Sequence, residues 1–287
     1  MKTVTSINGK IVAPRRAVIS VFDRGLLVGY GAFETILALD GRPIWLKHHL
    51  RRIGATIRAL SIANAPSQQS IELWVRAAAR AFGSTTARLR LAITAGSGEM
   101  WLSPTPIPPT VVIIVNAHSL GTAPVKADLV SRAHTRGWLD EHKTLSWLNT
   151  LFPDRASARD PRRYIRERLT LVNTPDHGVT EFTSANLILR RGDRITIPPP
   201  GSFFPGVTLA RALPWLKRKY SVTQRRVAPV DVRSADEIVA VSSLHFARAL
   251  AELRLPEGRG HRVYRYPAPQ LTPLLRAELA RLARRDA

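Results

Sequence analysis

The chain has 287 residues, 45% of them hydrophobic, so it is long enough for two domains with buried cores and is not a disordered chain. It has no cysteine, no apolar run near the roughly 18 residues of a membrane span and no apolar signal-peptide core, so we expect a cytoplasmic protein without disulfides or membrane contact. The net charge of +22 would suit a polyanion, but the arginines are dispersed and match no nucleic-acid-binding motif, which favours a solvated basic surface and no specific nucleic-acid partner.

The first predicted elements are two hairpins. Val4–Val12 has Asn8-Gly9 at its centre, and this dipeptide readily takes the positive φ angles of a two-residue turn. The same logic applies to Phe33–Leu39 and Arg42–Trp45, which flank Asp40-Gly41. The chain therefore begins with short antiparallel strand pairs.

A helix follows at Lys47–Leu60, where apolar residues recur at helical spacing. Ser70–Phe82 is predicted to form a second helix, and Ala87–Thr94 and Thr110–Val115 are predicted strands. Residues 96–109, between these strands, are rich in glycine and proline and predict an irregular loop. The first half of the chain is thus an α/β unit.

A polar segment of small residues at 116–123 suits a connection between domains. We therefore predict an N-terminal domain at 1–115, a linker at 116–123 and a C-terminal domain at 124–287. The eight histidines lack the paired spacing of a zinc site, so no metal is predicted.

Two segments of the second half suit a flat, phosphorylated ligand. Val179–Asn186 carries one carboxylate, Glu181, and leads through small hydroxylated residues into an apolar run. Pro205–Thr208 precedes a helix-compatible stretch, and backbone N–H groups at such a helix start bind anions. Each segment alone is equally typical of an ordinary turn or of an N-capped helix, so other parts of the chain must decide between these interpretations.

Further motifs in a fixed order decide it. With the two segments above, the chain resembles the class IV (fold-type IV) aminotransferases, a family of pyridoxal-phosphate enzymes that includes branched-chain and D-amino-acid aminotransferases and aminodeoxychorismate lyase. The resemblance rests on Ile7–Gly9, Phe22–Gly25, Gly29–Thr35, His49–Ile53, Lys143–Asn149 and Ala235–Leu244. It covers most of the chain.

The resemblance implies a fold, a cofactor and a set of site residues. The expected fold is α+β with two domains, an N-terminal α/β sandwich and a C-terminal β-barrel-like domain with helices, in a homodimer. Lys143 would bind pyridoxal phosphate covalently and move the α-proton, and Glu181 would face the pyridine nitrogen. The phosphate would be held by Arg52, the N–H groups of Val207 and Thr208, and the hydroxyl of Ser243.

Transamination between an amino acid or amine donor and a 2-oxo acid acceptor is the favoured function. The alternative is a lyase of the aminodeoxychorismate type, which releases pyruvate and 4-aminobenzoate, because Ser242–Leu244 is similar to that branch. A non-catalytic binding protein is a third hypothesis, and the presence of Lys143 and Glu181 argues against it. The chain departs from the family at Ser146 and Leu209. It also lacks an arginine and a histidine between Ala95 and Leu102, which argues against a D-amino-acid specialist and leaves the substrate open.

Overall fold

The computed structural model describes residues 2–83, 86–98, 107–132, 137–151, 168–258 and 260–286. The chain forms two compact units: the first comprises Met1–Leu120, His142–Trp147 and Ala283–Ala287, and the second comprises Gly121–Glu141 and Leu148–Leu282. The first change of unit falls inside the segment 116–123. Residues 99–106 of the expected loop, and residues 152–167 of the arginine-rich stretch before β8, lie outside the described residues.

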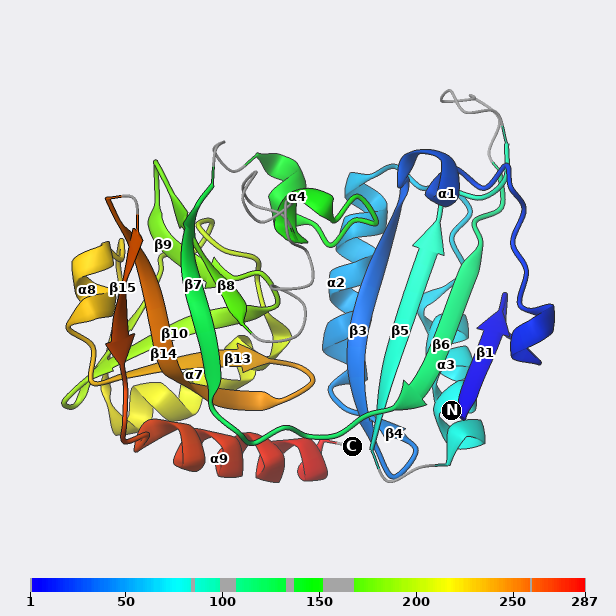
Figure 1. Cartoon of the computed structure of the whole chain (residues 1–287). Coiled ribbons are helices and arrows are strands. Elements are labelled where there is room, and N and C mark those ends of the chain that lie inside the picture. Colours follow the sequence, from blue (N-terminus) through cyan, green and yellow to red (C-terminus); the bar gives the residue numbers. More distant parts are fainter. Residues whose placement is uncertain are drawn as a thin grey trace. The chain divides into compact units, whose positions relative to one another are not determined.

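The first unit is one antiparallel sheet with helices packed on it (Figure 1). Its strand order is β2-β1-β6-β5-β3-β4. The strands are β1 Thr3–Ile7, β2 Lys10–Val12, β3 Gly31–Leu39, β4 Arg42–Pro43, β5 Thr86–Thr94 and β6 Val111–Ala117. The helices are η1 Pro14–Arg16, α1 Arg24–Val28, α2 Leu46–Ala59 and α3 Gln68–Phe82.

Both predicted hairpins are present. Asn8 and Gly9 have φ angles of 50° and 83°, and β1 pairs with β2 across them. Asp40 and Gly41 have φ angles of 48° and 72° and join β3 to β4. Positive φ is tolerated at glycine and, among other residues, best at asparagine and aspartate, so these dipeptides fix the turns.

The core of the first unit lies between the sheet and its two long helices. The apolar stripe predicted for α2 is buried at Leu50, Ile53 and Ile57, and it joins buried residues of α3 and of β3, β5 and β6 in one cluster. The prediction of an N-terminal α/β sandwich is confirmed.

The second unit is a barrel. Its sheet runs β12-β11-β10-β13-β14-β7-β8-β9, and a further pairing of β10 with β9 closes the run from β10 to β9 into a ring. The strands are β7 Val125–Ser131, β8 Leu169–Thr174, β9 Gly178–Phe182, β10 Ala185–Arg191, β11 Arg194–Ile197, β12 Ser221–Gln224, β13 Glu237–Ser242, β14 Phe246–Glu257 and β15 Gly260–Arg265. The helices are η2 Trp138–Glu141, α4 Leu148–Leu151, α7 Val207–Lys219, α8 Pro229–Arg233 and α9 Leu271–Arg285. The predicted α+β fold with a barrel-like second domain is confirmed.

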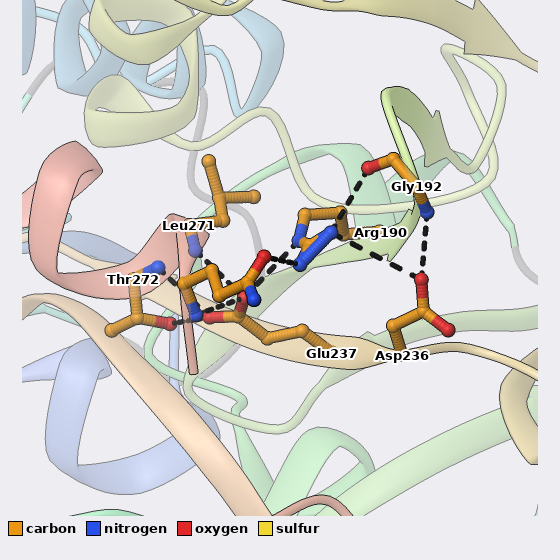
Figure 2. A network of polar contacts seen from close by, with 7 residues as sticks. Arg190, Gly192, Asp236, Glu237, Leu271 and Thr272 are labelled. Atoms are coloured by element: carbon orange, nitrogen blue, oxygen red, sulfur yellow. Dashed lines mark hydrogen bonds and ion pairs between the residues drawn. The ribbon is translucent and has the colours of Figure 1, made fainter. Parts of the chain in front are cut away.

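A buried carboxylate ties β13 to the start of α9 (Figure 2). Glu237 is 1% exposed and accepts hydrogen bonds from the backbone N–H groups of Leu271 and Thr272, at 2.7 and 2.8 Å. Arg190 of β10 donates to the same carboxylate at 3.4 Å. A carboxylate at a helix N-terminus satisfies N–H groups that have no partner within the helix. The network therefore anchors the strand that leads to Ser243.

None of the helices in the described part of the chain is long and apolar enough to cross a membrane.

Candidate active site

Lys143 lies along the edge of β3 in the first unit. The N–H of Phe33 donates to the carbonyl of Lys143 at 2.9 Å, and the N–H of Leu145 donates to Gly31 at the same distance. The Nζ atom of Lys143 is 4.6 Å from the ring centre of Phe33 and 4.2 Å from that of Trp147. These rings meet edge to face, with centroids 5.3 Å apart. The backbone fixes the base of this side chain, and two aromatic rings flank its amine.

Arg52, on α2, forms a two-point ion pair with Glu34 of β3. Its Nε and Nη2 atoms each lie 2.6 Å from a carboxylate oxygen, and the side chain of Glu34 is fully buried. Burial alone raises the pKa of Glu34, but the charges and hydrogen bonds of Arg52 and His49 outweigh it and lower that pKa to about 2. The carboxylate is therefore charged throughout the physiological range.

His49 completes this network one turn before Arg52. Its Nδ1 atom is 2.8 Å from the second oxygen of Glu34, and the side chain is 1% exposed. Burial lowers the pKa of His49; Glu34 opposes the shift, while Arg52 and Lys143 add to it. A neutral imidazole that donates from Nδ1 to the carboxylate fits these surroundings, and among the described residues its Nε2 has no hydrogen-bond partner. Arg52 and Lys143 thus share one electrostatic environment.

Glu181, in the second unit, lies where the barrel closes. It stands opposite Asn186 in the pairing of β9 with β10. Its Oε1 atom accepts from the backbone N–H of Phe204 at 2.9 Å, and its Oε2 atom accepts from the Asn186 amide at 3.5 Å. Both oxygens are therefore oriented by N–H donors, a setting that suits an ionised carboxylate.

The start of α7 provides an anion-binding arrangement. The helix begins at Val207, and its N-cap residue, Gly206, offers no side chain to cap the first N–H groups. Thr208 is 1% exposed, and its hydroxyl lies 3.3 Å from that of Ser243. Backbone N–H groups and two hydroxyls at a helix N-terminus are the donor set that binds a phosphate dianion.

Comparison with known families decides what this site belongs to. Residues 31–253 match the family described as amino-transferase class IV. The chain belongs to the class IV aminotransferases. The matched range includes all six residues that the sequence analysis assigned to the cofactor.

The similar proteins include both activities considered above. The chain is 30% identical to an aminodeoxychorismate lyase of Bacillus subtilis over 67% of this chain, and it spans 66% of that protein's length. It is 29% identical to a putative branched-chain-amino-acid aminotransferase of Methanocaldococcus jannaschii, with 81% of each chain covered. A hypothetical aminotransferase of Mycobacterium tuberculosis, solved in its PLP-bound form, matches the fold with a TM-score of 0.80 at 20% identity, with 100% of both chains covered.

Pyridoxal phosphate is the cofactor of this family, and the residues of this class IV chain fit it. The start of α7 leaves its first N–H groups to a ligand rather than to a capping side chain, which suits the phosphate. Lys143 supplies the primary amine, and Glu181 supplies a carboxylate with oriented oxygens. Arg52 and Lys143 lie in the first unit, whereas Glu181, Val207, Thr208 and Ser243 lie in the second.

Four other residues were not found by sequence reasoning. Glu34 and His49 carry the buried network around Arg52, and Asn186 and Phe204 orient Glu181. Asn186 ends the segment that drew attention in the sequence, but its partners depend on strand pairing. No periodicity marks Glu34, because it is a buried charge within an otherwise apolar strand.

Proposed function

We propose that this protein is a pyridoxal-phosphate-dependent aminotransferase that moves an amino group between an amino acid or amine and a 2-oxo acid. The observation that supports this most is that Lys143, Glu181 and the phosphate-binding start of α7 all occur in a chain that matches class IV aminotransferases over 31–253. A non-catalytic relative would be expected to lack the lysine or the carboxylate.

Lys143 has two roles in this proposal. Its amine holds the cofactor covalently, gives way to the substrate amine and then accepts the substrate's α-proton. The cofactor supplies an aldehyde for that bond and a ring that withdraws electrons from the reacting carbon. Phe33 and Trp147 restrict the positions that the amine can take.

The remaining residues bind and orient. Glu181 keeps the ring nitrogen protonated, because an ionised carboxylate accepts a hydrogen bond from it. Val207 and Thr208 donate N–H groups to the phosphate, and the hydroxyls of Thr208 and Ser243 add two further donors. Arg52 contributes a charged donor while its Nε–Nη2 edge pairs with Glu34.

A lyase of the aminodeoxychorismate type is the second candidate. Ser242-Ser243-Leu244, in the turn after β13, is similar to that branch of the family, and the Bacillus subtilis relative carries that name. Both reactions use the same lysine to remove the α-proton. They differ in the fate of the electrons: a transaminase passes the amino group to the cofactor, whereas the lyase expels pyruvate and needs no acceptor.

One experiment separates these activities. The purified protein, loaded with pyridoxal phosphate, is mixed with a panel of amino acids and amines without any acceptor. For a transaminase, the cofactor absorbance should shift with at least one donor, and 2-oxoglutarate or pyruvate should restore it. If no donor shifts the absorbance, and aminodeoxychorismate yields pyruvate and 4-aminobenzoate without an acceptor, the lyase assignment replaces ours.

A homodimer is part of the proposal. An apolar strip with several highly exposed side chains supports it: Val18 is 74% exposed, Val21 and Phe22 are each 66% exposed, and Leu26 of α1 is 60% exposed. Exposed apolar patches of this kind are commonly covered by a partner. Sedimentation of the protein should give a dimer mass, and Phe22→Glu with Leu26→Lys should give the monomer. A monomeric wild-type protein at micromolar concentration would contradict this part. The cytoplasmic location remains a prediction.

A further inference from the structure

The closing seam of the barrel places Glu181 next to an amide. The connection between β9 and β10 has only two residues, so Glu181 and Asn186 are direct partners in the antiparallel pair. Directly opposite residues of such a pair have Cβ atoms about 5 Å apart, close enough for side-chain contact. Asn186 is 5% exposed, so its amide groups must find partners inside the protein.

The Asn186 amide links two other groups. Its Nδ2 atom donates to the carbonyl of Phe204 at 2.8 Å and to Oε2 of Glu181 at 3.5 Å. The N–H of Phe204 donates to the other oxygen of Glu181 at 2.9 Å. Three residues from β9, β10 and the loop before α7 therefore form a closed ring of hydrogen bonds.

The same amide also determines which residue can precede α7. The φ and ψ angles of Gly206 are −76° and 131°, a conformation open to any residue, so backbone strain does not require glycine there. A Cβ atom at this position would instead collide with Oδ1 of Asn186. One face of Asn186 thus holds the carboxylate, and the other holds the N-cap of the helix.

We propose that Asn186 is a positioning residue that locks the carboxylate of Glu181 and the N-terminus of α7 into one fixed spacing. This inference rests on the proposed function, in which these two groups take opposite ends of the cofactor, the ring nitrogen and the phosphate. A rigid connection between them defines where a bound cofactor must lie. Asn186 acts through Glu181 and through Gly206.

The first test replaces the amide by its isosteric acid. Asn186→Asp turns both donated hydrogen bonds into repulsions, because a carboxylate then faces Glu181 and the carbonyl of Phe204. We expect at least a tenfold loss of pyridoxal-phosphate affinity. The absorbance of the bound cofactor should also acquire a pH-dependent change between about pH 5 and pH 8 that the wild type lacks, because two neighbouring carboxylates share a proton. Wild-type affinity together with a wild-type pH profile would overturn the proposal.

The second test needs no cofactor. Gly206→Ala should lower the Tm of the apoprotein, and the double variant with Asn186→Ala should lose less than the sum of the two single losses, because removing the amide makes room for the methyl group. Gly260→Ala is the matched control, since an added Cβ there would meet its nearest neighbour, the Glu257 carbonyl, at 3.8 Å. Additive losses would refute the contact.

These two readouts also separate the inference from the proposed function. Coupling between positions 186 and 206 in the apoprotein, in a protein that binds no pyridoxal phosphate, would refute the proposed function but leave the contact. Normal cofactor binding by the wild type, with additive losses and an unchanged Asn186→Asp variant, would refute the positioning role but leave the function.

Discussion

Arg52 spends one edge of its guanidinium group on Glu34, with two bonds of 2.6 Å to a fully buried carboxylate. The residue proposed for the phosphate is therefore also a structural counterion. Removing one partner of a buried pair leaves an uncompensated charge and costs about 3–5 kcal/mol. Variants at either position must be judged on folding before they are judged on activity.

The acid stability of the protein should depend on Glu34. Its pKa falls from 4.5 to about 2 on folding, so its contribution is fully present above about pH 4.5 and is lost as the pH falls toward 2. By about pH 3.5 roughly 1 kcal/mol of the wild-type advantage should be gone. Urea unfolding at several pH values should therefore show Glu34→Gln to be less stable at pH 7 and less sensitive to acid. A parallel pH dependence in both proteins would contradict the shifted pKa.

The phosphate role of Arg52 can be separated from its structural role by using two ligands. Arg52→Lys keeps a charge but loses the planar fork. Its affinity for pyridoxal phosphate should fall by the 1.5–3 kcal/mol typical of a charged hydrogen bond, about 10- to 150-fold, while its affinity for pyridoxal should change little. Fluorescence titration measures both. Equal losses for the two ligands would mean that only folding was affected.

Glu181→Gln should retain pyridoxal phosphate but lose activity by a factor on the order of a hundred, because an amide cannot keep the ring nitrogen protonated. The variant keeps an acceptor for the N–H of Phe204, so the loop before α7 should stay in place. Cofactor content and turnover are measured on the same sample. A variant that loses the cofactor as well would assign Glu181 to binding rather than to the ring electronics.

Local sequence signals predicted much of the fold. Asn8-Gly9 and Asp40-Gly41 mark their hairpins because few other residues accept positive φ. The spacing of Leu50, Ile53 and Ile57 predicted α2 because one face of a helix repeats every three to four residues. Such patterns act within a few residues and need no knowledge of the rest of the chain.

The missing parts of the site depend on distant pairing. Lys143 belongs to the first unit because its segment bonds along β3, more than 100 residues earlier in the sequence. Asn186 faces Glu181 only because β9 and β10 are joined by Thr183-Ser184, a dipeptide without the glycine that usually marks a two-residue turn. The family resemblance identified six site residues, but it did not predict the contacts that hold them.

The basic surface should bind nucleic acid only weakly. Binding of a dispersed charge to duplex DNA is counterion release without base contacts, so it should disappear at about 0.2 M salt. Gel-shift titrations at several salt concentrations test this, with a scrambled duplex as control. Tight, sequence-selective binding that survives such salt would add a function to the proposed enzyme.

The covalent role of Lys143 is the most direct prediction. Borohydride should reduce the bond between pyridoxal phosphate and this lysine to a stable secondary amine, and peptide mapping by mass spectrometry should find the added group on Lys143. Lys126 of β7 serves as an internal control, because it lies on an exposed strand position and should stay unlabelled. Lys143→Ala should bind the cofactor only reversibly and lose turnover, and because its aromatic neighbours remain, its fold should persist. Label on another lysine, or no label in protein supplied with the cofactor, would contradict the assignment.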